Sequence, residues 1–187
     1  MRRHAAIVGM FVLPLAIVMN TGPASAARSV TPGIGLVSCT HMSGTISFNP
    51  PLTIGGMAPE TTVFVLVATH CTGGTPNPTT VNSTSTITGA MSNCGDWVTA
   101  SPPSFTDSYK PAGIDSSPTA GGVWTIGLKP RISLSIMGAT TVGSYPSTNT
   151  AIQITTTEKW VKDVKRCRNR TRGLKSLRIK SGSITNL

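Results

Sequence analysis

The sequence predicts an all-β protein, an antiparallel β-sandwich or a flattened barrel of about seven to nine short strands. Three observations predict this class. Short apolar or alternating runs recur along the chain, separated by turn residues, with 19 glycines and 14 prolines in 187 residues. Charge is scarce and Ser and Thr are abundant, which fits strands and turns better than long helices. An even number of cysteines, four, predicts two disulfides in an exported chain.

Residues 1–26 predict a secretory signal peptide. A positively charged start precedes an apolar run over 5–19, which is too short to span a bilayer comfortably. The small residues at 24–26 (ASA) then fit a cleavage site. An uncleaved membrane anchor is the alternative interpretation. We expect residues 27–187 to form a single secreted β domain without a transmembrane span, located outside the cell or at its envelope.

Two strands that carry cysteines are expected near the start of the mature chain. Residues 37–48 alternate between apolar and polar positions, as a half-buried strand does. Residues 63–68 (VFVLVA) are the most apolar mature run and favour a central strand. We expect an antiparallel pair with Cys39 opposite Cys71. In that register one apolar face collects Met42, Ile46, Phe48, Phe64, Leu66 and Ala68.

The middle of the chain predicts three more strands and one long loop. Residues 79–88 are rich in Thr and Ser, which indicates an edge strand or a solvated face. The four prolines within 101–121 predict a long loop. Alternating patterns then predict strands over 122–128 and 131–137, joined by a hairpin or a bend between sheets.

The C-terminal part adds strands and one charged segment. A strand is expected over 150–157. Residues 158–171 form either one short helix or a basic loop, because Trp160, Val164 and Cys167 fall at helical spacing. We expect 173–187 to form a pair of strands, with inward Leu174, Leu177 and Ile179 and outward Lys175, Arg178 and Lys180.

The cysteines are expected to pair as Cys39–Cys71 and Cys94–Cys167. For the first pair, the strand register places both side chains on one face, as a bridge requires. The oxidising location supports both pairs.

Two histidines beside the first pair raise a zinc site as the alternative, with Cys39, His41, His70 and Cys71 as ligands. Strand periodicity puts His41 on the face of Cys39 but turns His70 away from Cys71. Four converging ligands are therefore not expected, and we predict no metal and no cofactor.

Several short motifs resemble a known group of proteins. Residues 39–52 (CTHMSGTISFNPPL), 71–74 (CTGG) and 181–184 (SGSI) are similar, in this order, to small secreted all-β proteins of actinobacteria. The resemblance covers most of the mature chain. It implies a disulfide-containing exterior protein and carries over no catalytic residue and no ligand. The basic stretch 159–180 departs from the more neutral ends of that group, so a function of this charge would be particular to this chain.

The residues offer little for catalysis, and we expect a non-enzymatic protein. There is no Gly-x-Ser-x-Gly elbow, and only two histidines remain after the signal peptide. A small secreted hydrolase is the weakest alternative. Its glycosidase form would need two facing carboxylates, and Asp107 and Asp115 are expected instead as solvated loop acids.

A carbohydrate- or ligand-binding module is a stronger alternative. Trp97 and Tyr109, together with the 101–121 loop, would supply aromatic faces for a sugar. Trp124 alternates with threonines on its strand, so we expect it to pack in the core.

Positive charge gathers near the C-terminus. The formal net charge is +10, and removal of Arg2 and Arg3 with the signal peptide lowers it to +8. A basic segment can hold an anionic partner, which outside a cell means lipid headgroups or anionic envelope polymers. Nucleic acid is not expected, because export denies access to it. A merely solvated charged face is an equal alternative. The candidate contact residues are Lys162, Lys165, Arg166, Arg168, Arg170 and Arg172.

Overall fold

The fold was analysed in a computed structural model of the chain, which describes residues 33–54, 59–92, 94, 104–111, 114, 116–127, 130–140, 142–168 and 173–186. Several sequence-based predictions fall outside the described residues: the signal peptide, and the roles of Trp97, Asp115, Arg170 and Arg172. For Trp124 and Trp160 the structure describes the backbone only.

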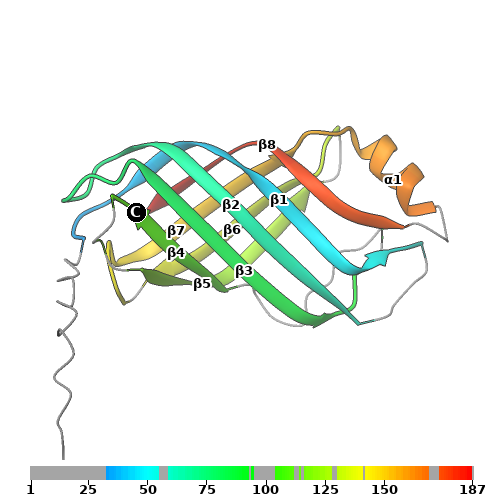
Figure 1. The fold of residues 1–187 in the computed structure, drawn as a ribbon, viewed down its shortest axis with the longest axis horizontal. Coiled ribbons are helices and arrows are strands. Elements are labelled where there is room, and N and C mark those ends of the chain that lie inside the picture. The colour runs from blue at the N-terminus through cyan, green and yellow to red at the C-terminus, as the bar shows by residue number, and fades with distance from the viewer. Residues whose placement is uncertain are drawn as a thin grey trace, which may run out of the picture.

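Eight antiparallel strands form one closed barrel (Figure 1). Each strand pairs with the next in sequence, and the last returns to pair with the first, so the sheet has no free edge. The strands are β1 (Ser38–Leu52), β2 (Glu60–Thr72), β3 (Thr80–Ala90), β4 (Ser104–Lys110), β5 (Ser117–Gly127), β6 (Ser133–Thr140), β7 (Ser147–Thr156) and β8 (Leu174–Asn186).

One helix, α1 (Trp160–Arg168), connects β7 to β8 and lies at one end of the barrel (Figure 1). Asp163 lies in its first turn and three basic residues lie in its last turn, a distribution that suits the helix dipole. The short-helix interpretation of 158–171 is therefore confirmed for 160–168. In the described part of the chain, no helix has the length and apolarity needed to cross a membrane.

The all-β class and both disulfides are confirmed, and the barrel alternative is the one adopted. The expected register is also confirmed, since Cys39 lies opposite Cys71 and Ile46 opposite Phe64. Several strands are longer than expected: β1 has 15 residues and β8 has 13. This length lets β8 pair with both β7 and β1, which closes the sheet.

Two expectations for individual segments are wrong, and one pair of alternatives is resolved. The predicted loop 101–121 contains β4 and the start of β5, because its prolines stand at strand ends: Pro111 follows β4 and Pro118 is the second residue of β5. Residues 173–187 contain one continuous strand, not two. Of the two alternatives for β3, the edge strand is wrong, because β3 pairs with both β2 and β4, and the solvated face is confirmed by the exposed Thr84, Thr86 and Thr88.

The core fills the inside of the barrel. The predicted apolar face is confirmed, with Phe64 and Leu66 fully buried, and the rings of Phe64 and Phe105 meet edge to face at 5.5 Å. Burial of each such side chain contributes about 1.5–3 kcal/mol to folding. A large part of the described interior is apolar, and this part holds the strands in place.

Tyr145 closes the end of the barrel away from α1. Its side chain is fully buried, its hydroxyl donates to the Pro76 carbonyl, and its ring lies 4.7 Å from that of Tyr109. Gly33 and Gly74 pack so closely against the Tyr145 ring that a Cβ at either position would overlap it. Glycine at these two positions therefore makes room for the tyrosine.

Candidate functional site

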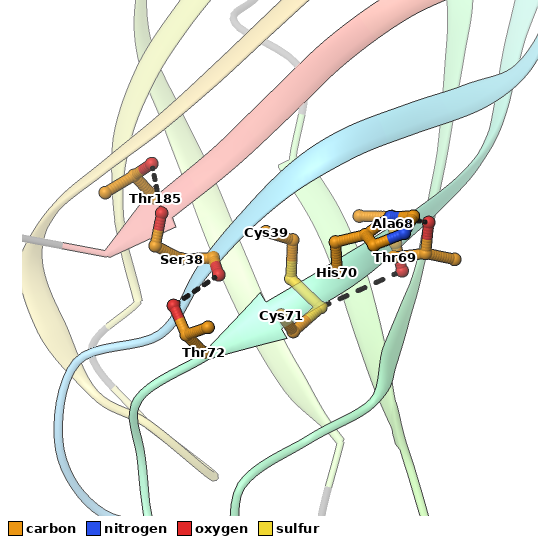
Figure 2. The surroundings of a disulfide bond; sticks show 8 residues. All are labelled: Ser38, Cys39, Ala68, Thr69, His70, Cys71, Thr72 and Thr185. Atoms are coloured by element: carbon orange, nitrogen blue, oxygen red, sulfur yellow. Dashed lines mark hydrogen bonds between the residues drawn. A yellow bond between two sulfur atoms is a disulfide. The ribbon is translucent and has the colours of Figure 1, made fainter.

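The first disulfide fastens the β1 and β2 ends that lie far from α1 (Figures 1 and 2). Figure 2 shows Cys39 and Cys71 bridged between the two strands, with β8 alongside. Ser38 hydrogen-bonds through its hydroxyl to Thr185 at 3.3 Å, and the Thr72 hydroxyl donates to the Ser38 carbonyl at 3.4 Å. This end is a structural junction of three strands.

The inside–outside alternation reverses beside this disulfide. Cys39 and Met42 are both buried although they are three residues apart, and Ala68 and Cys71 repeat this spacing on β2. His70 adopts a left-handed φ of 55°, at the point where the phase changes on β2. Because of this reversal, both cysteines enter the core.

The predicted placement is therefore wrong for His41 but confirmed for His70, which is exposed while Cys71 is buried. His41 is exposed while Cys39 is buried, so they do not share a face. The rings of His41 and His70 lie 5.8 Å apart, edge to face, on the outside of the barrel. With both cysteines oxidised, the two imidazoles are the only members left of the proposed zinc set. Among the described residues, no three His, Cys, Asp or Glu side chains are grouped to hold a metal.

The second disulfide fastens α1 to the barrel. Cys167 is buried on the inner side of the helix and bridges to Cys94, which follows β3. The Ile54 amide donates to the Cys167 carbonyl at 3.4 Å and ties the end of α1 to the segment after β1. The helix is therefore held at a fixed place on the barrel end, and its outer face points to solvent.

The outer face of α1 and the adjacent part of β8 carry a dense group of cations, here called the basic end. The predicted contacts Lys162, Lys165, Arg166 and Arg168 are exposed, and Arg166 of α1 lines one cleft with Arg178 of β8. The predicted outward orientation of the β8 cations is confirmed. The exposed cations are Lys159, Lys162, Lys165, Arg166, Arg168, Lys175, Arg178 and Lys180.

The acids near the basic end do little to neutralise it. Arg166 pairs with Glu158 at 2.8 Å and lies 3.9 Å from an Asp163 oxygen. Both acids therefore face the same arginine. Within the described part of the chain, the other seven cations have no carboxylate partner. Val161 is 61 % exposed on the helix ridge that also carries Lys165 and Arg168, at spacings of four and seven residues.

A cleft of about 440 Å³ lies between α1, the end of β7 and β8. Its buried lining comprises Thr156, Asp163 and Leu177, and its exposed lining comprises Thr157, Arg166, Ser176 and Arg178, with half-buried Glu158 between them. The Arg131 guanidinium donates to the Thr157 carbonyl, and the Thr157 amide donates to the Arg178 carbonyl at 2.8 Å. These bonds fix one wall.

The two carboxylates of the cleft have buried oxygens without hydrogen-bond partners. Asp163 is 1 % exposed, and neither of its oxygens has a hydrogen-bond partner; Oε2 of Glu158 is also buried without one. Burial raises the pKa of the Asp163 carboxyl, the nearby Glu158 raises it further, and Arg166 lowers it. No periodic pattern in the sequence indicates this site; the only signal is that both acids fall within the predicted 158–171 segment.

Asp107 is not the solvated loop acid that was expected. It lies 1 % exposed inside the barrel, where it accepts hydrogen bonds from the hydroxyls of Ser83 and, at 2.6 Å, Thr119. Burial raises the pKa of this carboxyl, and the two hydrogen bonds partly offset that effect. Hydrogen bonds continue from strand to strand through the set Ser83, Asp107, Thr119, Thr140, Thr150 and Asn186, here called the inner polar belt.

This arrangement leaves little support for the alternative functions. Asp107 is enclosed by the belt, so it is not placed as one of two facing carboxylates around a sugar. Tyr109 is 6 % exposed and packs against Tyr145, so its ring offers no surface for stacking. Burial and the nearby Asp107 raise the pKa of Tyr109.

Comparison with known proteins adds no analogy. No protein-family model matches the chain, and no curated protein or solved structure is significantly similar to it. The function is therefore inferred from the geometry of the basic end and its cleft.

Proposed function

We propose that this protein is an exported, non-enzymatic β-barrel that attaches to an anionic surface at or near the cell envelope through its basic end. The observation that carries the proposal is the one-sided charge of α1 and β8. Eight exposed cations lie there, and both nearby acids are directed to Arg166. The two disulfides are compatible with an extracellular location.

The physical basis is long-range attraction to a charged surface. Near an anionic lipid surface, each Lys or Arg contributes about 1 kcal/mol, and the attraction decays within a Debye length. The rigid mounting of α1 supports the proposal, because its lysines need no ordering of the backbone on binding. The contact residues proposed are those of the helix, with Lys175 and Arg178 beside them.

The test measures cosedimentation of the mature protein with phosphatidylcholine vesicles that contain or lack phosphatidylglycerol. We expect binding only to the anionic vesicles, with a strong loss at high salt, where the Debye length falls from about 10 Å to about 3 Å. The double variant Lys162→Gln/Lys165→Gln should bind about thirtyfold more weakly, at about 1 kcal/mol per charge.

The matched control is Lys110→Gln, which removes one exposed charge from β4, away from the helix. It should bind as the unmodified protein does. Retention that does not change with salt, or an equal loss in Lys110→Gln and Lys162→Gln, would refute the proposal. A second arm with soluble polyglutamate distinguishes a lipid bilayer from an anionic polymer as the natural surface. If the protein is adapted to a bilayer, Val161→Gln should weaken binding to anionic vesicles but leave binding to polyglutamate unchanged.

A further inference from the structure

The cleft beside α1 contains a concentration of unsatisfied polar atoms. Four buried side-chain oxygens in the described part of the protein have no hydrogen-bond partner, and three of them belong to Asp163 and Glu158. Buried polar groups in folded proteins are nearly always hydrogen-bonded, so each exception calls for an explanation. Three exceptions that share one cleft indicate a site shaped for a group that donates hydrogen bonds.

The chemistry of these atoms defines one half of the ligand. Asp163 Oδ1, Asp163 Oδ2 and Glu158 Oε2 are acceptors without a hydrogen-bond donor. Arg166 pairs with the other Glu158 oxygen at 2.8 Å, and its second terminal nitrogen stays 3.9 Å from Asp163 Oδ1, beyond hydrogen-bond distance. A primary ammonium group carries one positive charge and three N–H donors. It matches the number of free acceptors, and it would compensate the burial of a carboxylate, which is costly when unpaired.

The rim of the cleft defines the other half. Arg178 lines the cleft, is exposed, and makes no ion pair with any described residue. Its guanidinium can bind a phosphate or carboxylate in a bidentate manner. The hydroxyls of Thr157 and Ser176 lie on the same exposed part of the lining and can donate to an anion.

We propose that this cleft binds a compact zwitterion, with its primary ammonium group at Asp163 and Glu158 and its phosphate or carboxylate at Arg178. The volume of about 440 Å³ is within the range of small-molecule sites. A metal ion alone would leave the rim arginine without a partner and would be repelled by it. This site shares Arg178 with the proposed surface attachment, but it does not use Lys162 and Lys165, the α1 lysines through which that attachment is tested.

The test is calorimetric titration of the mature protein with O-phosphoethanolamine, compared with phosphocholine. The two probes carry the same types of charge, but phosphocholine lacks N–H donors. We expect saturable binding of phosphoethanolamine and at least about tenfold weaker binding of phosphocholine, since hydrogen bonds between charged groups are the strong ones. Vesicles of phosphatidylethanolamine and of phosphatidylcholine then establish whether a lipid headgroup or only the free zwitterion is accepted.

Two variants connect the binding to the named atoms. Asp163→Asn should abolish phosphoethanolamine binding, and circular dichroism checks that the barrel persists. Arg178→Gln, at an exposed position that needs no repacking, should weaken binding about tenfold. Lys162→Gln/Lys165→Gln should leave it unchanged, which separates this inference from the surface attachment.

Equal binding of the two probes, no binding of phosphoethanolamine, or saturable binding of Ca²⁺ alone that Asp163→Asn abolishes would each overturn the zwitterion site.

Discussion

Replacement of Asp107 by asparagine tests how the inner polar belt contributes to stability. The side chain keeps its shape, and its amide can still accept from one hydroxyl and donate to the other. What changes is the charge. In the folded protein the Asp107 carboxyl is 1 % exposed and its pKa is raised by burial, against an ordinary value of 3.8.

The sign of the effect follows from linkage. Because folding raises this pKa, the folded chain holds the Asp107 proton more tightly than the unfolded chain does. The stabilising contribution is fully present below the unfolded value of 3.8 and is lost as the pH rises through the higher folded pKa. Each unit of that rise corresponds to about 1.4 kcal/mol of stability lost at neutral pH.

Asp107→Asn should therefore be more stable than the unmodified protein at about pH 7 and equally stable near pH 4. Asp107→Leu is the matched contrast. It leaves the buried Ser83 hydroxyl without its acceptor, whereas Thr119 keeps Thr140, so it should lose about 1–3 kcal/mol at both pH values. The measurement is urea unfolding at the two pH values. A larger loss for Asp107→Asn at neutral than at acidic pH would refute the reasoning.

Two further predictions concern the disulfides and the glycines. Cys94→Ser/Cys167→Ser opens a loop of 73 residues, so it should lower the free energy of unfolding by about 4 kcal/mol, and it should weaken vesicle binding because α1 is released. Removal of the other disulfide should lower the free energy of unfolding by a similar amount, but the fraction that stays folded should bind vesicles as before. Gly44→Ala should cost more than about 2 kcal/mol in urea unfolding, because its φ is 147° and a Cβ would lie 2.9 Å from the Leu66 Cα. Gly89→Ala is its control: φ is 70° and nothing lies within 4 Å of the added atom, so only the backbone cost of about 1 kcal/mol remains. Equal losses in the two glycine variants would contradict the steric explanation.

The sequence predicted the elements whose local pattern agrees with their place in the barrel. β1 and β2 alternate in phase with their burial over 42–48 and 62–68, and the expected pairing of their cysteines matches the observed register, although the phase reverses next to the cysteines. The pattern failed at β4 because the prolines around it stand at strand ends and not in a loop. It failed in β8 because Gly182 lies inside a continuous strand and not in a turn. Gly182 lies where the neighbouring strand passes so close that a Cβ would overlap the Gln153 carbonyl, so glycine indicates close strand contact instead of a turn.

The sequence predicted the exposed lysines of the basic end, but it did not predict that Asp163 and Asp107 are buried. Exposure of Lys162 and Lys165 follows from local helical periodicity, which is visible in the sequence. The burial of Asp163 depends on where α1 packs against the barrel. That position is set partly by the disulfide from Cys167 of α1 to Cys94, which lies 73 residues earlier, so local periodicity does not show it. Asp107 had a usable signal, since Phe105, Asp107 and Tyr109 alternate as inward residues, but the surrounding prolines masked it.

The two ends of the barrel differ in their roles: one end is closed and stabilised, and the other carries the residues of the proposed function. At one end Tyr145 fills the opening, and Cys39–Cys71 joins the strands beside β8. At the other end α1 is held by one disulfide and leaves a polar cleft in which both Asp163 oxygens and one Glu158 oxygen have no hydrogen-bond donor. A protein that needed only stability would gain from replacing Asp163 with an apolar residue, because a buried carboxylate without hydrogen bonds is costly. The presence of Asp163 there is most simply explained by a ligand that compensates this cost.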